Sequence, residues 1–515
     1  MRERKNRPIK PLALMYPSLE LLRKDVLLTK KEADELRSIE SPIVLCDLRS
    51  HPENGIDTQN IAPGLQRIGA MLPYTPLMEL ILSRWGKPVV ATSGNISGSP
   101  IFYKDEQAFT QLGDIADLFV SHNREIFTPQ DDTVVQFSPI FDQKIVLRRS
   151  RGLAPAFFQQ SFNDWKTPVL AMGADMKNAF AIQHEGYTYI SQYLGNLESY
   201  DNQLAFDHTR EHLTEILRFR PKVILTDAHP GYFSTAKGQH LGEKWNIPVI
   251  SVQHHEAHFS AVLAENNLLF SEEPVLGVIW DGTGYAKGEN GAEIWGGEFF
   301  IFENGKFTKV ACIDSFPSIM GDKMAKEPRL SALSLSHFVP EVEPLIRYYF
   351  NDAEWSYYKK LVKNNQYTPS SSMGRVFDAV AAILGIAEFN SFEGEAAMRL
   401  EALARSRKSS ENINVYPTRI THLLQTVFRN MIEGVDKSHI AASFHLALVN
   451  MIRETAETHN ITRIAFSGGV FQNAFLTDLI IQHLDATFQL YFHQQLSPND
   501  ENIALGQLAY FYLNQ

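Results

Sequence analysis

The sequence predicts an α/β protein of two domains, and three observations support this class. A chain of 515 residues is too long for one hydrophobic core and should form two to four domains. Short apolar strands alternate with helical patterns through residues 1–157, and a strand–turn–strand opening occurs twice from residue 168 onward. We therefore predict a first domain at 1–157, a linker at 157–167 and a second domain at 168–515, whose lobes span about 168–270 and 275–515.

The first domain is predicted from strands at 43–46 and 89–91, a helix at 76–84 and a closing strand at 139–150. The strand at 89–91 continues directly into Thr92-Ser93-Gly94-Asn95, a turn that offers two hydroxyls and an amide. Because α/β sheets usually bind ligands at the ends of their strands, this turn is a candidate binding element.

The second domain opens with strands at 169–172, 179–183 and 187–191. A helix at 204–219, a strand at 223–226 and a helix–strand pair ending at 249 follow. Residues 275–302 then repeat the order strand, Gly-rich turn, strand. This repeated opening is typical of the two-lobed actin, sugar-kinase and heat-shock ATPase (ASKHA) architecture. Residues 325–410 are mostly helical in pattern and are predicted as an insertion in the second lobe.

Composition narrows the class of protein. The formal charge of -11 argues against a protein that coats nucleic acid, because such binding needs a broad basic surface. Cys46 and Cys312 are the two cysteines of the sequence, which excludes a disulfide framework and a cysteine zinc finger. No apolar run approaches the roughly 18 residues of a membrane span, and the first residues lack the apolar core of a signal peptide. We expect a cytoplasmic protein.

Basic residues gather at the N-terminus and near residue 150. The N-terminal group consists of Arg2, Arg4, Lys5, Arg7 and Lys10, and the later group of Arg148, Arg149 and Arg151. On composition alone, a solvated tail is the favoured interpretation of the first group. The alternative is a clamp for the triphosphate of ATP.

His254 and His258 have the spacing that puts two side chains on one face of a helix, close enough to hold one metal ion. The zinc-peptidase motif His-Glu-x-x-His does not fit, because His258 lies only three residues after His255. Asp281 and Asp500 would complete a mixed set that suits iron, zinc or manganese better than calcium. The alternative is two helix histidines without a ligand, which is usual for an isolated pair.

Two glycine-rich turns are candidate nucleotide-binding elements. Asp281-Gly282-Thr283-Gly284 follows a strand and favours a phosphate-binding β-hairpin over a dinucleotide fingerprint, because the next segment is strand-like. Ser467-Gly468-Gly469 lies between a strand at 463–466 and a helix through 484, whose N-terminus could receive a phosphate or an adenosine. Ordinary tight turns are the alternative for both.

The second half resembles the C-terminal module of the NiFe-hydrogenase maturation carbamoyltransferases, the HypF family. It also shares an architecture with the tRNA threonylcarbamoyl transferases. The run Glu393-Gly394-Glu395-Ala396-Ala397-Met398-Arg399 separates it from those relatives. The matching stretches, which lie across nearly all of 168–515, are 227–235, 252–258, 281–285, 374–382, 392–401, 467–473 and 499–507.

The first half resembles the YrdC-type adenylating domain. The motifs that carry this resemblance are Lys5-x-Arg7, Thr92-Ser93-Gly94-Asn95, Asp131-Asp132-Thr133-Val134 and Arg148-Arg149-Ser150-Arg151-Gly152. The two resemblances imply a YrdC-like domain followed by an ASKHA domain with a helical insertion.

The resemblance also implies site residues. Lys5 and Arg7 would neutralise ATP phosphates, while Ser93 and Asn95 would hydrogen-bond phosphate and the carbamoyl group. The implied metal ligands are His254, His258, Asp281 and Asp500. The implied nucleotide-binding set consists of Lys5, Arg7, Ser93, Asn95, Arg149, Gly282, Thr283, Gly284, Gly468, Gly469 and Asn473.

The implied reaction uses ATP with Mg²⁺ to adenylate carbamate derived from carbamoyl phosphate. A transition metal, iron or zinc, would then assist transfer of the carbamoyl group to the C-terminal cysteine of a HypE-like maturation protein. Family members normally begin with an acylphosphatase and a zinc-finger region. We expect these regions either to lie on another chain or to have been lost. Asn196, Tyr193 and Gln130 depart from the family pattern. A tRNA-modifying enzyme and a weakened partner-binding scaffold stay open as alternatives.

Overall fold

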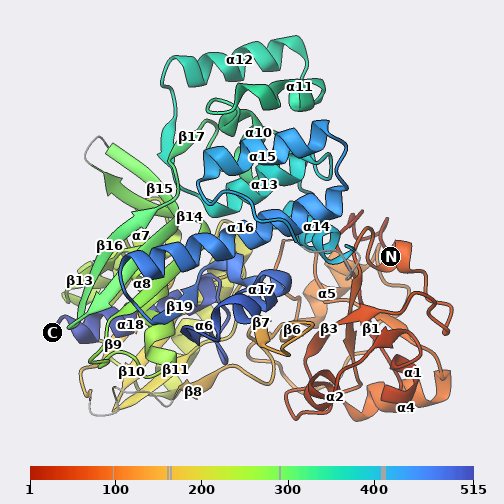
Figure 1. The fold of residues 1–515 in the computed structure, drawn as a ribbon. Coiled ribbons are helices and arrows are strands. Elements are labelled where there is room, and N and C mark those ends of the chain that lie inside the picture. The colour runs from red at the N-terminus through yellow and green to blue at the C-terminus, as the bar shows by residue number, and fades with distance from the viewer. Residues whose placement is uncertain (97, 159–161, 163–164, 289–290, 408–412) are drawn as a thin grey trace. The chain divides into compact units, whose positions relative to one another are not determined.

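The computed structural model describes the chain except residues 97, 159–161, 163–164, 289–290 and 408–412, so the predicted linker at 157–167 lies partly outside the described residues (Figure 1). The chain forms two compact units. The first unit comprises Met1–Phe137, Lys144–Val252 and Gln494–Tyr512, and the second comprises Ser138–Gln143, Gln253–His493 and Leu513–Gln515. The second predicted domain, 168–515, therefore has residues in both units, with the first change of unit at 252–253.

The first unit begins with a mixed sheet of order β5-β1-β4-β3-β6-β7, in which β2 also pairs with β3. Its strands are β1 (Ala13–Met15), β2 (Val26–Leu27), β3 (Ile43–Leu48), β4 (Arg67–Met71), β5 (Val89–Ala91), β6 (Val134–Phe137) and β7 (Lys144–Arg148). The helices are α1 (Leu19–Leu22), α2 (Lys30–Leu36), α3 (Thr58–Ile61), α4 (Pro76–Trp85) and α5 (Asp105–Leu112). Tyr16, Val44, Ile68 and Val135 are fully buried in its core.

Local sequence explains where α4 begins and ends. The Thr75 side chain accepts a hydrogen bond from the backbone of Met78, and Pro76 occupies the first helical turn. Gly86 ends the helix at a φ of 69°, a conformation that glycine adopts without steric cost. The helix predicted at 76–84 and the strands predicted at 43–46 and 89–91 are confirmed.

The closing strand predicted at 139–150 is wrong in its first part. Residues 138–143 form the turn between β6 and β7, where Ser138 donates its backbone N–H to the carbonyl of Gln143. The apolar run at 134–137 is β6 itself, so the segment is a hairpin rather than one strand.

A second sheet of the first unit has the order β13-β12-β9-β10-β11-β8. Its strands are β8 (Ala156–Phe158), β9 (Val169–Ala171), β10 (Ala181–His184), β11 (Tyr187–Ile190), β12 (Val223–Asp227) and β13 (Val249–Val252). The helices with it are α6 (Tyr200–Ile216), α7 (Phe233–Trp245) and, after the 3₁₀ turn η4 (Asp500–Asn502), α18 (Ile503–Leu513). β9, β10 and β11 form an antiparallel meander, which confirms the strand–turn–strand opening predicted for this lobe.

The second unit is built on a sheet of order β17-β18-β15-β14-β19-β20, with β16 paired to β15. Its strands are β14 (Val275–Gly288), β15 (Gly291–Glu303), β16 (Lys306–Cys312), β17 (Phe316–Ser318), β18 (Thr368–Ser370), β19 (Arg463–Ser467) and β20 (Gln489–Tyr491). One core joins Leu276, Val278 and Trp280 of β14 to the helices.

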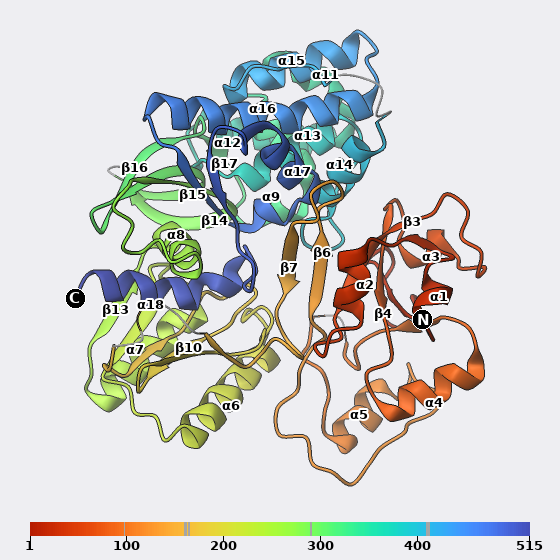
Figure 2. The same cartoon turned by 60° about the horizontal axis from the view of Figure 1, so that its bottom comes forward.

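Helices make up most of the rest of the second unit. They are α8 (His254–Glu265), α9 (Lys323–Lys326), α10 (Pro328–Leu335), α11 (Glu343–Ile346), α12 (Asp352–Lys363), α13 (Met373–Ile383), α14 (Glu395–Arg405), α15 (Ile420–Ile432), α16 (Lys437–Thr458) and α17 (Ala474–Leu484), with the 3₁₀ turns η1 (Pro340–Val342), η2 (Arg347–Tyr349) and η3 (Gly469–Gln472). Helices α10 to α14 lie within 328–405, which confirms the mostly helical pattern predicted for 325–410. Figure 2 shows α11, α13 and α14 together with the later helices α15 and α16. No helix among the described residues is long and apolar enough to cross a membrane.

The predicted hairpin turn at Asp281-Gly282-Thr283-Gly284 is wrong in position. β14 continues through this motif, and the chain reverses between Gly288 and Gly291, with 289–290 outside the described residues. The motif is instead an irregularity in the β14–β15 pairing. Trp280 pairs with Gly297 and Gly284 pairs with Trp295, so three residues of β14 face one residue of β15. Such bulges bend a strand and redirect its side chains.

Candidate metal centre and adenylating cluster

Three of the predicted metal ligands meet in the second unit. Gln253 caps the N-terminus of α8 by accepting the backbone N–H of Glu256, which starts the helix at His254. His254 and His258 lie one turn apart, with ring centroids separated by 4.9 Å. Asp281 Oδ2 lies 3.7 Å from His254 Nε2 and 3.9 Å from His258 Nε2. One ligand atom from each of the three residues lies within 4.8 Å of those of the other two.

Asp281 is held in place by the β14 bulge and by η3. Its Oδ1 accepts the backbone N–H of Gly469 at 2.9 Å, while Oδ2 faces the histidines. Burial alone would raise the pKa of this carboxyl, but the neighbouring His254, His258 and His255 outweigh it and hold the pKa below its usual range. Two imidazole nitrogens and a carboxylate form a donor set that fits zinc, iron or manganese.

The glycines beside these ligands differ in how much space surrounds them. A Cβ on Gly284 would lie 2.2 Å from His255 Cε1, and a Cβ on Gly468 would lie 2.2 Å from the carbonyl oxygen of Trp280. Gly468 also has a φ of 104°. A Cβ on Gly282 would meet no atom within 4 Å, and Thr283 beside it is exposed. Gly284 and Gly468 therefore allow close packing, whereas Gly282 and Thr283 border open space.

The sequence reasoning assigned no role to His255 or Glu298. His255 Nε2 lies 3.3 Å from Glu298 Oε2, and both side chains are fully buried. Glu298 also accepts the backbone N–H groups of Gly296 and Gly297 and the Ser371 hydroxyl, and Lys309 lies 3.6 Å away. Burial raises the pKa of Glu298 to about 7. A single carboxylate within the apolar run of β15 was the sequence signal that could have identified it.

Asp500 belongs to the first unit and lies at the start of η4, where it is 6% exposed. Asn499 caps this turn by accepting the backbone N–H of Glu501 at 3.1 Å. Glu501 in turn accepts the backbone N–H of Arg149, and burial raises the pKa of Glu501 to about 8. The predicted acidic turn is thus formed in the first unit, and Asp500 at its start is buried.

The predicted adenylating residues form a cluster in the first unit. Lys5 Nζ donates to the carbonyl oxygen of Ser93 at 2.7 Å, to Thr92 Oγ1 at 3.2 Å and to Asn95 Oδ1 at 3.3 Å. The Ser93 hydroxyl donates to Asn95 Oδ1 at 2.8 Å. The structure therefore brings Lys5, Ser93 and Asn95 together at the end of β5, although 88 residues separate Lys5 from Ser93.

Burial and neighbouring positive charges disfavour the charged forms of Lys5 and Arg7. Burial, and next the charge of Arg7, lowers the pKa of Lys5. Burial also lowers the pKa of Arg7, followed by the charges of Arg2 and Arg148. Clustered, partly buried cations with lowered pKa values mark a candidate site for an anion.

Arg149 and Asn473, which were also predicted to bind nucleotide, hydrogen-bond to other residues of the protein. Arg149 is 5% exposed and donates from its guanidinium to the carbonyl of Ser191 at 3.0 Å. Asn473 Oδ1 accepts the backbone N–H of Leu476 and so caps α17, while Asn473 Nδ2 lies 3.0 Å from His445 Nε2. Arg149 and Asn473 are both engaged within their own units.

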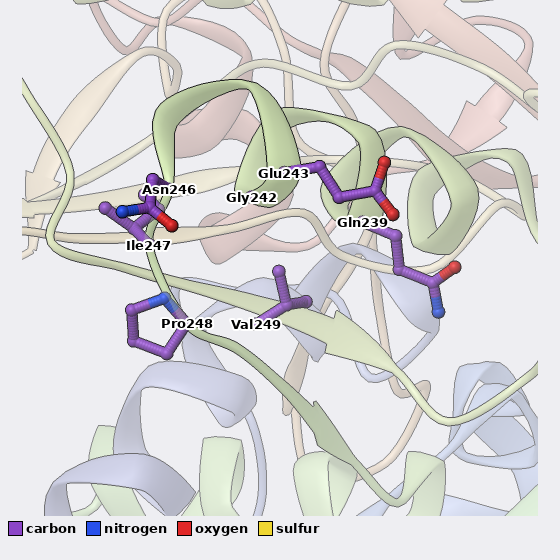
Figure 3. Close-up of a pocket in the computed structure, with 7 residues that line it drawn as sticks. All are labelled: Gln239, Gly242, Glu243, Asn246, Ile247, Pro248 and Val249. Carbon is purple, nitrogen blue, oxygen red and sulfur yellow. The ribbon is translucent and has the colours of Figure 1, made fainter.

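A hollow of about 430 Å³ lies at the C-terminal end of α7 in the first unit, and Figure 3 shows the residues that line it. It is lined by Gln239, Gly242, Glu243, Asn246, Ile247, Pro248 and Val249. None of the predicted site residues is among the described residues that line it, so the hollow contributes nothing to either cluster.

Comparisons with known proteins match three segments of the chain to family models. Residues 1–150 match the family model described as "Telomere recombination" (Sua5, YciO and YrdC). Residues 164–265 match the HypF Kae1-like domain, and residues 277–507 match the second subdomain of the carbamoyltransferase Kae1-like domain.

Named relatives match over almost the whole chain. The carbamoyltransferase HypF of Synechocystis sp. is 36% identical over 99% of this chain and 68% of its own length. That of Rhodobacter capsulatus is 33% identical over 98% of this chain and 67% of its own. A crystal structure of full-length HypF, in a phosphate- and nucleotide-bound form, superimposes with a TM-score of 0.90 at 31% identity and covers 99% of this chain and 80% of that one.

The chain belongs to the HypF carbamoyltransferase family and is a carbamoyltransferase with a YrdC-like and a Kae1-like part. The resemblance to the hydrogenase maturation carbamoyltransferases is thereby confirmed, as is the mixed α/β fold.

Proposed function

We propose that this protein uses ATP to form carbamoyl adenylate and then transfers the carbamoyl group to the C-terminal cysteine thiolate of a HypE-like maturation protein, in the synthesis of the cyanide ligands of NiFe-hydrogenase. The first step would take place in residues 1–157 and the second in residues 168–515. Carbamate oxygen attacks the α-phosphorus of ATP and releases pyrophosphate. The thiolate then attacks the carbamoyl carbon and releases AMP.

The Lys5 cluster would carry the first step. Lys5 and Arg7 would offset the charge of the Mg²⁺-bound triphosphate, and Ser93 and Asn95 would orient the carbamoyl group. Binding of an anion would relieve the mutual repulsion of cations whose pKa values burial already lowers. Oxygens of the Thr92–Asn95 turn hold Lys5, which keeps its ammonium at the end of β5.

His254, His258 and Asp281 would hold one zinc or iron ion, and we propose Asp500 as the fourth ligand on the strength of its acidic turn. A bound ion of this kind supplies Lewis acidity toward the phosphate and the carbamoyl carbonyl. The exposed Thr283 and the open side of Gly282 would border the adenylate, with Gly468 and Gly469 on the neighbouring strand end. The roles of Arg149 and Asn473 in nucleotide binding would require them to leave their present partners.

The observation that carries the first step of this proposal is the triple contact of Lys5 Nζ with Thr92, Ser93 and Asn95. We expect carbamate-dependent exchange of labelled pyrophosphate into ATP in the wild-type protein, measured with carbamoyl phosphate and an added acylphosphatase. Lys5→Ala and Arg7→Ala should abolish this exchange, whereas the exposed Lys30 of α2 provides the control variant Lys30→Ala.

Two results would contradict the proposal. Exchange that persists in Lys5→Ala at the wild-type rate would remove the cluster from the adenylating site. A wild-type protein that shows no exchange under any of these conditions would favour a partner-binding scaffold.

A further inference from the structure

A series of buried polar side chains in the second unit, each in contact with the next, begins at His258. Ser467 Oγ lies 3.3 Å from His258 Nδ1 and 2.9 Å from His493 Nε2. His493 Nδ1 lies 2.6 Å from Glu265 Oε2. His258 and Ser467 are fully buried, and the side chains of His493 and Glu265 are 1% and 2% exposed. We call these three residues beyond His258 (Ser467, His493 and Glu265) the relay.

The end of the relay sets the direction of its hydrogen bonds. A carboxylate only accepts, so Glu265 takes the N–H of His493 Nδ1. The Nε2 of a neutral His493 then accepts the hydroxyl proton of Ser467. Ser467 Oγ is left to accept the N–H of His258 Nδ1, which leaves the lone pair of His258 on Nε2.

That nitrogen faces the candidate metal centre, since His258 Nε2 lies 3.9 Å from Asp281 Oδ2. We propose that Glu265, His493 and Ser467 are positioning residues that hold His258 in its Nδ1–H tautomer and present Nε2 to the metal ion. Outer partners of this kind fix the ring orientation of metal-bound histidines and increase their basicity. The inference rests on the metal centre of the proposed function and adds to it the residues that prepare one ligand.

The same three residues have the order of a serine–histidine–carboxylate triad, which suggests a different role. A nucleophilic serine must reach its substrate, however, and Ser467 is fully buried at the end of β19. Its oxygen also contacts His258, a second imidazole that a nucleophile does not require. The geometry therefore favours positioning of His258 over nucleophilic attack by Ser467.

The test measures Zn²⁺ affinity of the full chain by competition with a chromophoric chelator. Ser467→Ala removes the acceptor of His258 Nδ1, and Glu265→Gln removes the charge that orients the relay. We expect each variant to bind Zn²⁺ about 10–100-fold more weakly than the wild type. Ser331→Ala, which removes another fully buried hydroxyl of the same unit, should leave the affinity unchanged. Wild-type affinity in folded Ser467→Ala and Glu265→Gln would overturn the inference.

A second measurement needs no variant and therefore does not depend on the variants folding. In the Co²⁺-loaded wild type, the proton NMR spectrum should show a strongly shifted, slowly exchanging N–H signal from Nδ1 of His258. A His258 without that proton would contradict the relay, as would labelling of Ser467 by a fluorophosphonate. A wild-type chain that binds neither ion contradicts the metal centre itself, whereas binding that depends on His258 but not on the relay contradicts this inference alone.

Discussion

His254 and His258 differ in their surroundings from another histidine pair of the same spacing. His208 and His212 are also four residues apart, on α6, with ring centroids separated by 6.4 Å and His208 exposed. His254 and His258 are instead buried beside the carboxylate of Asp281. The spacing alone therefore does not identify a ligand pair. The carboxylate of Asp281 on β14 distinguishes His254 and His258 from the pair on α6.

We predict that the purified chain carries about one transition-metal ion and loses it in the His254→Ala/His258→Ala double variant, because two donors disappear. Elemental analysis measures the content directly. The His208→Ala/His212→Ala double variant is the matched control and should keep its metal. Equal metal content in both double variants would contradict the assignment.

Glu298 predicts a pH dependence of stability. Its folded pKa of about 7 lies above the ordinary value of 4.5, so its stabilising contribution is complete below pH 4.5 and is lost as the pH rises through 7. The difference corresponds to about 3 kcal/mol at most. We expect Glu298→Gln to flatten the decline in unfolding temperature between pH 5 and pH 8. Glu303→Gln, at the exposed end of β15, should keep the wild-type decline, and an equal decline in Glu298→Gln would refute the prediction.

The sequence located individual site residues better than it located their partners. Lys5, Ser93 and Asn95 could be predicted because a basic run and a polar strand end are both local signals, and the structure brings them together. The relay could not be predicted in this way, because 228 residues separate Glu265 from His493 and each is an unremarkable polar residue of its own segment. Ser467 pairs with Ile279 of β14 and contacts His258 of α8, and both contacts join segments that are far apart in the sequence.

At the scale of elements, the position of the turn near the Asp281-Gly282-Thr283-Gly284 motif could not be predicted from local sequence. Its composition suits a hairpin turn, and the sequence could not show that Tyr285 and Ala286 continue the pairing with β15. The bulge that results directs Asp281 toward α8. The elements themselves were predicted well, because strand and helix patterns are local, while the exact position of the reversal depends on a partner strand.

Gly284 and Gly282 allow a matched test of this bulge. A Cβ on Gly284 would collide with His255, whereas one on Gly282 would meet open space. We predict that Gly284→Ala displaces the start of α8, destabilises the second unit by about 1–3 kcal/mol and reduces the metal content. Gly282→Ala should keep wild-type stability and metal content. Denaturant unfolding and elemental analysis measure both, and identical behaviour of the two variants would contradict the packing argument.

At the scale of the whole molecule, the compact units do not follow the order of the sequence, because each is assembled from separate segments. Residues 494–512 belong to the first unit, although in the sequence they follow 253–493, the longest segment of the second unit. The predicted boundary near 157–168 overlaps both the gap between the family matches at 1–150 and 164–265 and the start of the second match. It stays a proposal for the domains. Patterns of apolar residues predict where strands and helices occur, but they do not specify which distant segments pack into one core.

The central claim is that a HypE-like protein, and not tRNA, accepts the carbamoyl group. A chain with 48 basic and 59 acidic residues is poorly suited to binding tRNA, whereas a protein tail needs no broad basic surface. The most direct measurement incubates the protein with ATP, labelled carbamoyl phosphate, acylphosphatase, tRNA and a HypE-like partner, and follows the label. We predict ATP-dependent labelling of the partner's C-terminal cysteine, lost in Lys5→Ala and in Asp500→Ala. Label on tRNA with none on the partner, or labelling of the partner without ATP, would contradict the account.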